Sequence, residues 1–517
     1  MIPASSFPAS EKEHKRGSIL RGEVRKEIAL IAFLFLVFLI VATLLSAQLF
    51  PVWLDEVLLT DPAANLWLGN GFTSSAWYYQ VQDEFWACNS PLYPFLLFFW
   101  LKLFGFGVTS ARSLNYLLIV ASMGLIWWAV YRLDLIVTMR DRLIAVFLLL
   151  FSAGISFSYL SGRYDCLAIL LFSALILTYS FQPSLWQKVA FASIGFLVPL
   201  SGFHLLPYAV IMAVLLFIYL GRPVIYPAVA TFGGMIMGIA SMLLLYAQQG
   251  VLKVFVSSLG GHSLVGIETP VGDASNAQKA MYVLSNLLPI LATRFSGIVR
   301  WYTGDKTFVF LYLAALVLAC IQLYSKRMRL RSPLTFALLS GLVVPLLMGL
   351  ARDYPAYYAW MALLPLTLGI AATLIEWRGT LLRRPAMLVV VLLLIAAMIP
   401  GLPTQLVPAF ANLKNRDYQR VEQFVQNNIA PDEAVYSDFG PYYAIRRQVN
   451  FVLFPTYLDM MTEADKTKLS TALIDTKQSH HNYKDIEIFN ALGGSWEEAE
   501  EKLDTTQFNL RIFRRSS

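Results

Sequence analysis

The run IALIAFLFLVFLIVATLLSAQLF, residues 28–50, decides the fold class of this chain. It holds no charged residue and matches the roughly 20 apolar residues that a helix needs to cross a bilayer. Similar runs recur along the 517 residues, which are 57% hydrophobic and only 14% charged. Soluble domains carry about 25% charged residues. The sequence therefore predicts an α-helical polytopic membrane protein.

We predict about 11 to 13 transmembrane helices. Two shorter apolar stretches, Leu92–Phe106 with Lys102 and Met281–Tyr302 with two arginines, are expected to lie at the membrane interface or to re-enter it. The segment 1–27 is a polar, mixed-charge tail with no cleavage site after the first run, so we expect a retained anchor. The candidate spans are 28–50, 112–132, 142–160, 164–181, 187–203, 205–221, 224–247, 307–325, 333–351, 356–376 and 386–402.

Lysine and arginine predict the orientation. If the tail 1–27 is cytoplasmic, every strong basic cluster falls in a short cytoplasmic loop, as the positive-inside rule requires. Counting 92–106 as a full span would instead put Arg132–Arg142 outside. The net charge of +7 follows from these loops, so we expect no nucleic-acid partner. The expected location is a bacterial inner or plasma membrane.

This orientation leaves external segments at 51–111 and 248–306 of the transmembrane domain 28–402, and a C-terminal extracytoplasmic domain at 403–517. The last segment is polar and is typical of a small α/β domain. The chain has three cysteines, Cys88, Cys166 and Cys320, and their spacing matches no known motif. We therefore expect neither a disulfide framework nor a thiolate metal site. In the C-terminal domain we predict helices at 417–428, 463–476 and 497–503 and strands at 434–437 and 508–513.

Two adjacent carboxylates, Asp55 and Glu56, follow the first span closely. Charges beside the hydrocarbon core are costly unless solvated or paired, and they mark functional sites more often than charges elsewhere. A solvated pair at the interface is the alternative interpretation. By itself the dipeptide is a weak signal.

Other ionisable residues lie in the turns on the same predicted face. Arg163 and Asp165 stand together after the third span; they could form an ion pair, although positions two apart do not face each other on a helix. A lone histidine at such a turn is more often hydrogen-bonded than a ligand. The remaining members of this set are Arg112, His204, His262 and Arg352.

If these residues share one face, they suit a reaction at the membrane boundary on an amphiphilic substrate. Arginine binds phosphate through paired hydrogen bonds. A carboxylate can accept the proton of an attacking hydroxyl. A sugar linked to a lipid phosphate would place its tail among the spans and its phosphate at this boundary.

The sequence resembles the GT-C superfamily of integral membrane glycosyltransferases, and within it the protein O-mannosyltransferase-like branch with the lipid A aminoarabinose transferases. The resemblance rests on the Asp55-Glu56 pair, the loop leading to Pro91-Leu92-Tyr93, the arginine at 112 and the Arg-x-Asp at 163–165. Recognisable motifs cover the first 210 residues or so. Beyond them the likeness lies in the topology and the C-terminal domain.

The resemblance implies an inverting transfer from a polyprenyl-phosphate sugar to a glycan, lipid or protein acceptor. It makes Asp55 the base on the acceptor, with Glu56 in support and Asp165 as a second acidic residue. It gives donor phosphate contacts to Arg112, Arg163, His204 and Arg352.

The resemblance also bears on a cofactor. His262 matches a histidine that helps to hold a divalent metal in some relatives. Its acidic partner there precedes the Pro-Leu motif, where this chain has Cys88 and Asn89. We therefore expect catalysis without a metal.

Two other functions remain open from the sequence. A lipid or glycan transporter would place ionisable residues near the bilayer midplane and often shows repeats, which this chain lacks. A surface polysaccharide polymerase or ligase would fit the length and basic residues of 248–306 but not the early Asp-Glu pair. The C-terminal domain could also serve only as a binding module.

Overall fold

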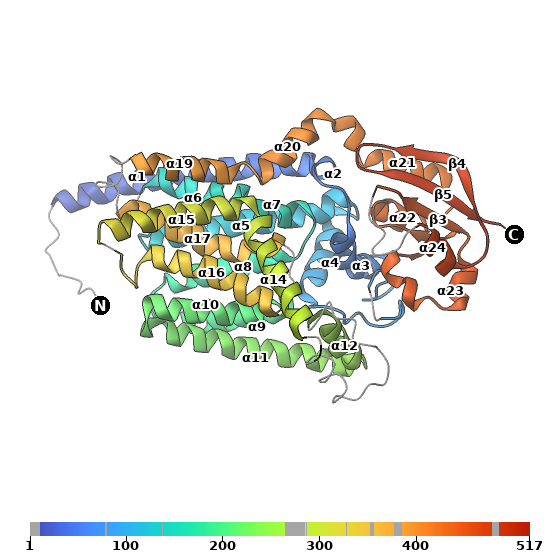
Figure 1. Ribbon diagram of the computed structural model, residues 1–517, viewed down its shortest axis with the longest axis horizontal. Coiled ribbons are helices and arrows are strands. Elements are labelled where there is room, and N and C mark those ends of the chain that lie inside the picture. The colour runs from blue at the N-terminus through green and yellow to red at the C-terminus, as the bar shows by residue number, and fades with distance from the viewer. Residues whose placement is uncertain are drawn as a thin grey trace.

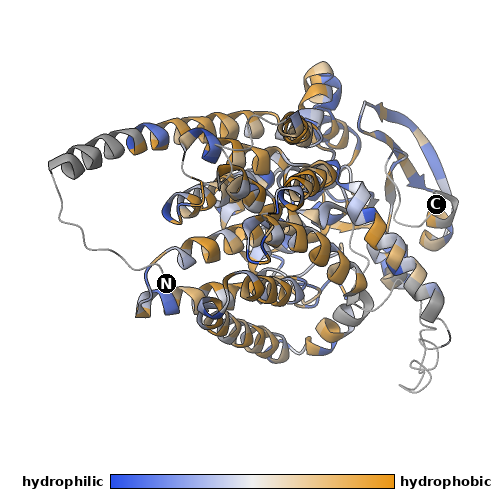
Figure 2. Cartoon of the chain, turned by 60° about the vertical axis from the view of Figure 1, so that its left-hand side comes forward, coloured by the Kyte–Doolittle hydropathy of each residue, from blue (hydrophilic) through white to orange (hydrophobic). Residues whose placement is uncertain are grey.

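The computed structural model describes residues 11–77, 80–136, 138–263, 285, 287–326, 328–351, 356–376, 385–477 and 485–516. Figure 1 shows a bundle of roughly parallel helices with a smaller sheet-containing unit at one end. Figure 2 shows that the bundle is mainly hydrophobic and that the sheet carries much of the polar sequence. The predicted division into an apolar helical part and a polar C-terminal part thus appears in the architecture.

Helices that could cross a membrane are numerous in the described part of the chain. Six are long and apolar enough, and two helix pairs pass the same test as bent spans. The six are α1 (Glu11–Leu44), α5 (Val108–Arg132), α11 (Ile225–Gln248), α15 (Lys306–Tyr324), α16 (Pro333–Ala351) and α17 (Trp360–Glu376), and the bent pairs are α6 (Met139–Phe151) with α7 (Ala153–Leu160) and α19 (Pro385–Met398) with α20 (Leu402–Ala411).

Of the four shorter apolar helices among the described residues, Leu92–Phe104 falls in the predicted interfacial stretch, and the other three match predicted spans: α8 (Asp165–Tyr179), α9 (Leu185–Ser201) and α10 (Leu205–Leu220). Each of the eleven predicted runs coincides with one of these helices or bent pairs. The fold class is therefore confirmed. The larger number of 11 to 13 crossings stays a prediction, because only six to eight meet the length criterion.

The two bent spans differ from the uninterrupted helices predicted at 142–160 and 386–402. The chain bends by 58° between α6 and α7 and by 48° between α19 and α20. The breaks touch each other: a side chain at Gly401 would approach the Phe151 carbonyl oxygen to 1.9 Å. Thr307 bridges them, since its hydroxyl accepts from the Ala153 amide at 3.0 Å and donates to the Ala397 carbonyl at 2.9 Å. Backbone groups freed at each break are thus partly satisfied by the neighbouring helices.

The predicted external loops hold helices of their own. The segment 51–111 contains α3 (Leu54–Leu68), α4 (Leu92–Phe104) and the start of α5, and a short α2 (Ser46–Leu49) precedes it. The segment 248–306 contains α12 (Leu252–Ser263) and α14 (Leu287–Gly304). Elsewhere in the chain, the 3-10 helix η1 (Arg222–Val224) precedes α11 and the 3-10 helix η2 (Ala356–Ala359) precedes α17. At the other end, part of the predicted tail 1–27 is helical, because α1 begins at Glu11.

The C-terminal unit is a five-stranded mixed sheet with helices. Strand order is β2-β1-β3-β5-β4, with β2, β1 and β3 parallel and β5 antiparallel to both neighbours. Its elements are η3 (Leu413–Arg416), α21 (Gln419–Asn428), β1 (Ala434–Ser437), α22 (Tyr442–Gln448), β2 (Phe451–Leu453), η4 (Pro455–Met460), α23 (Glu463–Lys468), β3 (Thr471–Asp475), α24 (Asp485–Leu492), β4 (Trp496–Asp504) and β5 (Asn509–Arg515).

Two local predictions in this unit are wrong. The helix expected at 463–476 ends at Lys468, and Thr471–Asp475 is the fully buried central strand β3. The helix expected at 497–503 is the edge strand β4, which pairs with β5. Residues 496–504 are rich in glutamate and favour a helix locally, but pairing with a neighbouring strand overrides a weak propensity.

Candidate functional site

Figure 1 shows α3 at the end of the bundle that faces the C-terminal unit, and most of the predicted site residues gather near the first turn of this helix. Asp55 and Glu56 lie in the first turn of α3, and Asp165 begins α8. Carboxylates are stabilised at helix N-termini by the exposed amides and the helix dipole. Arg112 lies near the start of α5, and Arg163 lies in the turn between α7 and α8. We call these five residues the acidic–arginine cluster.

Arg163 forms hydrogen bonds to two carboxylates of the cluster and to a tyrosine. Its Nε donates to Asp165 Oδ2 at 2.6 Å, and its Nη1 donates to Asp55 Oδ2. Its Nη2 donates to the Tyr358 hydroxyl at 2.8 Å. The guanidinium also lies over the Tyr357 ring, 4.1 Å from the centroid. One cation therefore fixes two carboxylates and two tyrosines that come from three separate parts of the chain.

The ion pair between Arg163 and Asp165 corrects an expectation from helical geometry. Positions two apart do not meet on a helix, but Arg163 is not helical. Gly162 has φ +68°, a left-handed conformation that suits glycine, and ends the turn after α7. The side chain of Arg163 can therefore fold back onto the first residue of α8.

Asp55 is the most accessible carboxylate of the cluster. Its side chain is 25% exposed, whereas those of Glu56 and Asp165 are fully buried. Both of its hydrogen bonds, from Arg163 and from the Tyr357 hydroxyl at 2.9 Å, end on Oδ2. Among the described residues, Oδ1 accepts none. This oxygen is therefore available to a substrate hydroxyl.

Glu56 and Arg112 are occupied with each other. Nε and Nη2 of the arginine donate to the two carboxylate oxygens at 2.8 and 2.6 Å, and both side chains are fully buried. Three more donations go to the carbonyls of Ser46 at 2.6 Å, Phe50 at 2.7 Å and Pro51 at 3.3 Å. A guanidinium has five N–H donors, and all five are used. The predicted phosphate contact by Arg112 is therefore not supported.

Asp165 is held as tightly as Glu56. The indole Nε1 of Trp360 donates to Asp165 Oδ1 at 3.1 Å, while Arg163 occupies Oδ2. Its side chain has no exposure. Asp165 therefore orients Arg163, and both of its carboxylate oxygens are occupied in this geometry.

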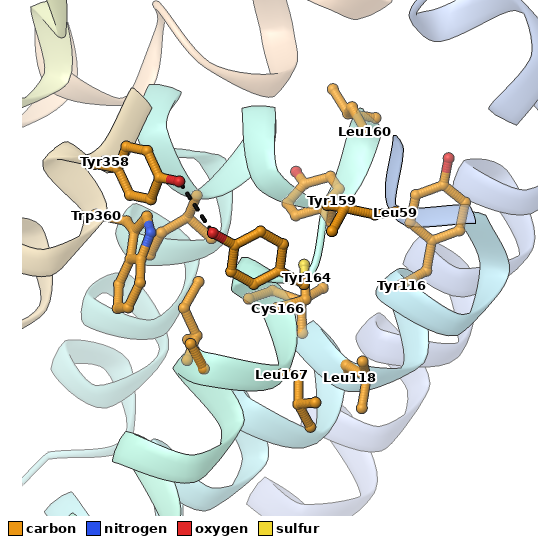
Figure 3. Close-up of a cluster of buried hydrophobic side chains, with 14 of the residues drawn as sticks. Leu59, Tyr116, Leu118, Tyr159, Leu160, Tyr164, Cys166, Leu167, Tyr358 and Trp360 are labelled. Atoms are coloured by element: carbon orange, nitrogen blue, oxygen red, sulfur yellow. Dashed lines mark hydrogen bonds between the residues drawn. The ribbon is translucent and has the colours of Figure 1, made fainter. Parts of the chain in front are cut away.

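His204 joins the cluster through tyrosines. Its Nδ1 is hydrogen-bonded to the Tyr164 hydroxyl at 3.3 Å, and that hydroxyl lies 3.1 Å from the hydroxyl of Tyr358. Figure 3 shows the Tyr164–Tyr358 bond among the buried side chains of Tyr159, Cys166 and Trp360. The imidazole thus belongs to a buried chain that leads to Arg163, in keeping with the interpretation of a hydrogen-bonded histidine.

Two predicted site residues cannot be placed. Arg352 lies outside the described residues, and so does the side chain of His262, whose backbone belongs to α12. In the described ranges there is no group of three metal-ligating side chains. Cys88, at the position where the resemblance would place an acidic metal ligand, is buried and hydrogen-bonded to Gln80 Oε1 at 3.2 Å. Burial, and then the nearby Glu84 carboxylate, raise the pKa of the Cys88 thiol, so it stays protonated and is a poor metal ligand.

Several residues of the site were missed from the sequence. Tyr357, Tyr358 and Trp360 contact the cluster from η2 and the start of α17, and Trp360 lies 195 residues after Asp165. The run Tyr354-Pro-Ala-Tyr-Tyr-Ala-Trp360 was a signal, since it gathers hydroxyl and indole donors at a predicted external turn. Tyrosine and tryptophan usually find a polar partner when buried.

The C-terminal unit also reaches the cluster. Tyr443 of α22 donates to Glu56 Oε1 at 3.0 Å, and Tyr442 donates to Asp61 Oδ1 at 3.1 Å. Arg446 of the same helix pairs with Asp61 at 3.4 Å. One face of α22 therefore contacts two successive turns of α3, the helix that carries Asp55 in its first turn.

The charges of the cluster nearly cancel. Three carboxylates and two guanidinium groups leave one negative charge among Asp55, Glu56, Asp165, Arg112 and Arg163. A phosphate would therefore need further cations. Arg294 is a candidate, because it is buried on α14, which packs against η2. The sequence had singled it out only as an interruption of an apolar stretch.

Comparisons with known proteins address the fold. No protein-family model matches the sequence, and no curated protein matches it. Among solved structures, ArnT from Cupriavidus metallidurans bound to undecaprenyl phosphate is 12% identical, with 93% of this chain and 97% of ArnT covered and a TM-score of 0.54. The apo state of the same protein gives 12% identity, 93% and 98% coverage and a TM-score of 0.56.

The chain has the fold of the GT-C glycosyltransferases. The likeness extends over nearly the full length of both chains, so it includes the C-terminal unit as well as the bundle. It confirms the fold that the early motifs predicted. The oligosaccharyltransferase of Archaeoglobus fulgidus, tethered with an acceptor peptide, is 13% identical, with coverage of 86% and 69% and a TM-score of 0.44.

Proposed function

We propose that this GT-C protein is an inverting glycosyltransferase that moves a sugar from a polyprenyl-phosphate donor to an acceptor hydroxyl. The observation that carries the proposal is the state of Asp55. It is a partly exposed carboxylate whose Oδ2 is fixed by Arg163 and Tyr357 and whose Oδ1 is open among the described residues. A base must be held in place and still reach the proton that it takes.

The reaction is a single displacement at the anomeric carbon. The acceptor oxygen forms a bond to that carbon as the bond to the phosphate oxygen breaks, and the electron pair leaves with the polyprenyl phosphate. Asp55 Oδ1 takes the acceptor proton. Attack opposite the leaving group inverts the anomeric configuration.

Arg163 serves this step in two ways. It holds Asp55 Oδ2 in place, and two of its five N–H groups have no partner among the described residues. Donors already aimed at a site stabilise charge that develops there in the transition state. We assign the leaving phosphate to Arg163 and Arg294, and leave Arg112 and Glu56 as the buried pair that supports α3.

The lipid nature of the donor follows from where the site lies. The cluster is at one end of an apolar bundle, so a substrate there can keep its chain in the membrane. ArnT, which shares the fold, was solved with undecaprenyl phosphate. We place the site and the C-terminal unit on the external face, since the opposite end of the bundle carries the basic loops.

Asp55→Asn tests the proposal. The variant should lose transfer from a polyprenyl-phosphate sugar in membranes by at least about 100-fold, as expected for loss of a general base. Asp83→Asn, an exposed carboxylate of the loop that follows α3, is the matched control and should keep full activity. Retained transfer by a folded Asp55→Asn protein would remove Asp55 as the base.

A further inference from the structure

An apolar cavity of about 340 Å³ lies in the bundle away from the acidic–arginine cluster. Its walls are α8, α10, α11, α16 and α17. Along α10 it extends from Tyr208 to Leu220, a rise of about 18 Å at 1.5 Å per residue. We call it the far-end cavity. Its length suits an extended lipid chain better than a compact ligand.

The far-end cavity is closed towards the cluster. Tyr208 is buried there, donates to the Met361 carbonyl at 2.8 Å and packs edge-on against Trp360. At the other end the lining is more open, and the side chain of Leu220 is 37% exposed. A ligand would therefore enter from the end of the bundle opposite the C-terminal unit (Figure 1).

Four exposed cations surround this entrance. Arg222 lies in η1 beside the lining residue Val224, and Arg331 lies two positions before the lining residue Pro333. A side chain at Gly221 would come within 3.9 Å of the Arg331 guanidinium, so the two loops are adjacent. The other two cations, Arg132 and Lys188, lie over the rings of Phe181 and Tyr226. We call Arg132, Lys188, Arg222 and Arg331 the basic rim.

The part of the chain that the structure describes does not neutralise the basic rim. None of its four members forms an ion pair with another described residue. Asp134, exposed and next to the lining residue Leu133, is an acidic neighbour, so an excess of about three positive charges remains. Basic loops alone would follow from the positive-inside rule. That rule does not account for an apolar cavity directly beneath them.

We propose that the far-end cavity and the basic rim bind one anionic phospholipid. One acyl chain fills the cavity, and the phosphate headgroup lies among the cations of the rim. Basic pockets between transmembrane helices bind anionic headgroups in this manner. A zwitterionic lipid would fill the cavity equally well but would gain less from the rim.

The position of this lipid connects it to the cluster. Three walls of the far-end cavity begin at site residues: α8 at Asp165, α10 directly after His204, and α17 at Trp360. A chain packed between these helices would hold the far halves of helices whose first residues belong to the site. Bound phospholipid should therefore also raise glycosyl transfer, a consequence that rests on the proposed function, whereas binding itself does not.

Binding is measured on the purified full-length protein with phosphatidylglycerol and with phosphatidylcholine of the same chains. Native mass spectrometry counts bound lipids, and thermal melting gives the affinity. We expect one tightly retained phosphatidylglycerol and a higher melting temperature than with phosphatidylcholine. Arg222→Gln with Arg331→Gln should weaken phosphatidylglycerol binding about 30-fold, at roughly fivefold for each cation.

Matched variants distinguish lipid binding at the far-end cavity and basic rim from general effects of charge or side-chain size. Arg140→Gln removes an exposed cation of α6 outside the rim and should leave binding unchanged. Ala213→Phe fills the cavity and should abolish retention, whereas Val214→Phe, at a residue 54% exposed on the same helix, should not. Should Ala213→Phe fail to fold, the double rim variant and Arg140→Gln still test the proposal.

Three results would overturn the proposal. One is equal binding of the two phospholipids by the unaltered protein. The second is an effect of Arg140→Gln as large as that of the double rim variant. The third is displacement of phosphatidylglycerol from the rim by undecaprenyl phosphate at lower concentration, which would make the far-end cavity part of the donor site.

Discussion

Arg163 and Asp55 are 108 residues apart in the sequence and form an ion pair in which the arginine Nη1 donates to the carboxylate Oδ2. The same guanidinium holds Asp165 and Tyr358. The orientation of Asp55 therefore depends on α3, α8 and η2 at once. A change in any of these three elements should reach the carboxylate that we propose as the base.

Arg163→Lys should impair transfer while keeping the charge. A lysine ammonium cannot reproduce the planar fork that reaches three partners, and a displacement of about 1 Å at a catalytic group can cost about 100-fold in rate. We expect kcat to fall by about that factor with a smaller change in KM. Steady-state kinetics checks this, with Arg511→Lys, at a side chain of β5 that is 40% exposed, as the control. Equal kinetics for both variants would argue against a role of Arg163 in orienting Asp55.

Glu56→Gln should destabilise the protein. It leaves Arg112 buried without its counter-charge, and breaking a buried pair in this way costs about 3–5 kcal/mol. Thermal melting in detergent should show the loss. Glu500→Gln, at an exposed position of β4, should melt like the unaltered protein. If Glu56→Gln kept full stability and lost only activity, Glu56 would belong to the catalytic step instead.

Tyr443→Phe should loosen the C-terminal unit from α3. The variant loses the hydrogen bond to Glu56 Oε1 at 3.0 Å, and bonds to charged groups contribute about 1.5–3 kcal/mol. We expect a lower melting temperature and faster proteolysis between the bundle and the C-terminal unit. Tyr324→Phe, at an 86% exposed side chain, is the control. Unchanged proteolysis would show that other contacts of α22 suffice for docking.

Gly162→Ala should disturb the turn that presents Arg163. Gly162 has φ +68°, and an added Cβ would approach the Glu56 Cγ to 2.6 Å. Strain in the left-handed region costs about 1–3 kcal/mol, and the clash adds to it. Gly233→Ala, in α11 with open space around the new atom, should be neutral or stabilising. A stable and active Gly162→Ala protein would mean that the turn can shift without moving Arg163.

Much of the bundle could be predicted from sequence because apolar length is a local property. Every predicted run coincides with a helix or a bent pair, and strand 434–437 is found with its predicted bounds. The bends after Phe151 and Met398 could not be predicted, because they depend on two helices that meet at Gly401. The strand β4 was missed for a similar reason: its glutamates favour a helix, and only pairing with β5 makes it a strand.

The candidate site was predicted in part. Asp55, Glu56, Asp165, Arg112, Arg163 and His204 do lie together, as their shared position at predicted span ends indicated. Which of these residues is accessible and which is buried in an ion pair could not be predicted. Asp55 and Glu56 are adjacent in sequence, yet one is 25% exposed and the other is buried against Arg112.

The sequence by itself determined which segments are apolar helices and that ionisable residues recur where those helices end, since length, composition and order suffice for both. Only the tertiary structure decided which carboxylate stays accessible and which arginine has all of its N–H donors occupied by neighbouring residues. The physical reason is that hydrogen-bond partners and burial come from α3, α8, η2 and α22, which lie far apart along the chain and meet only on folding.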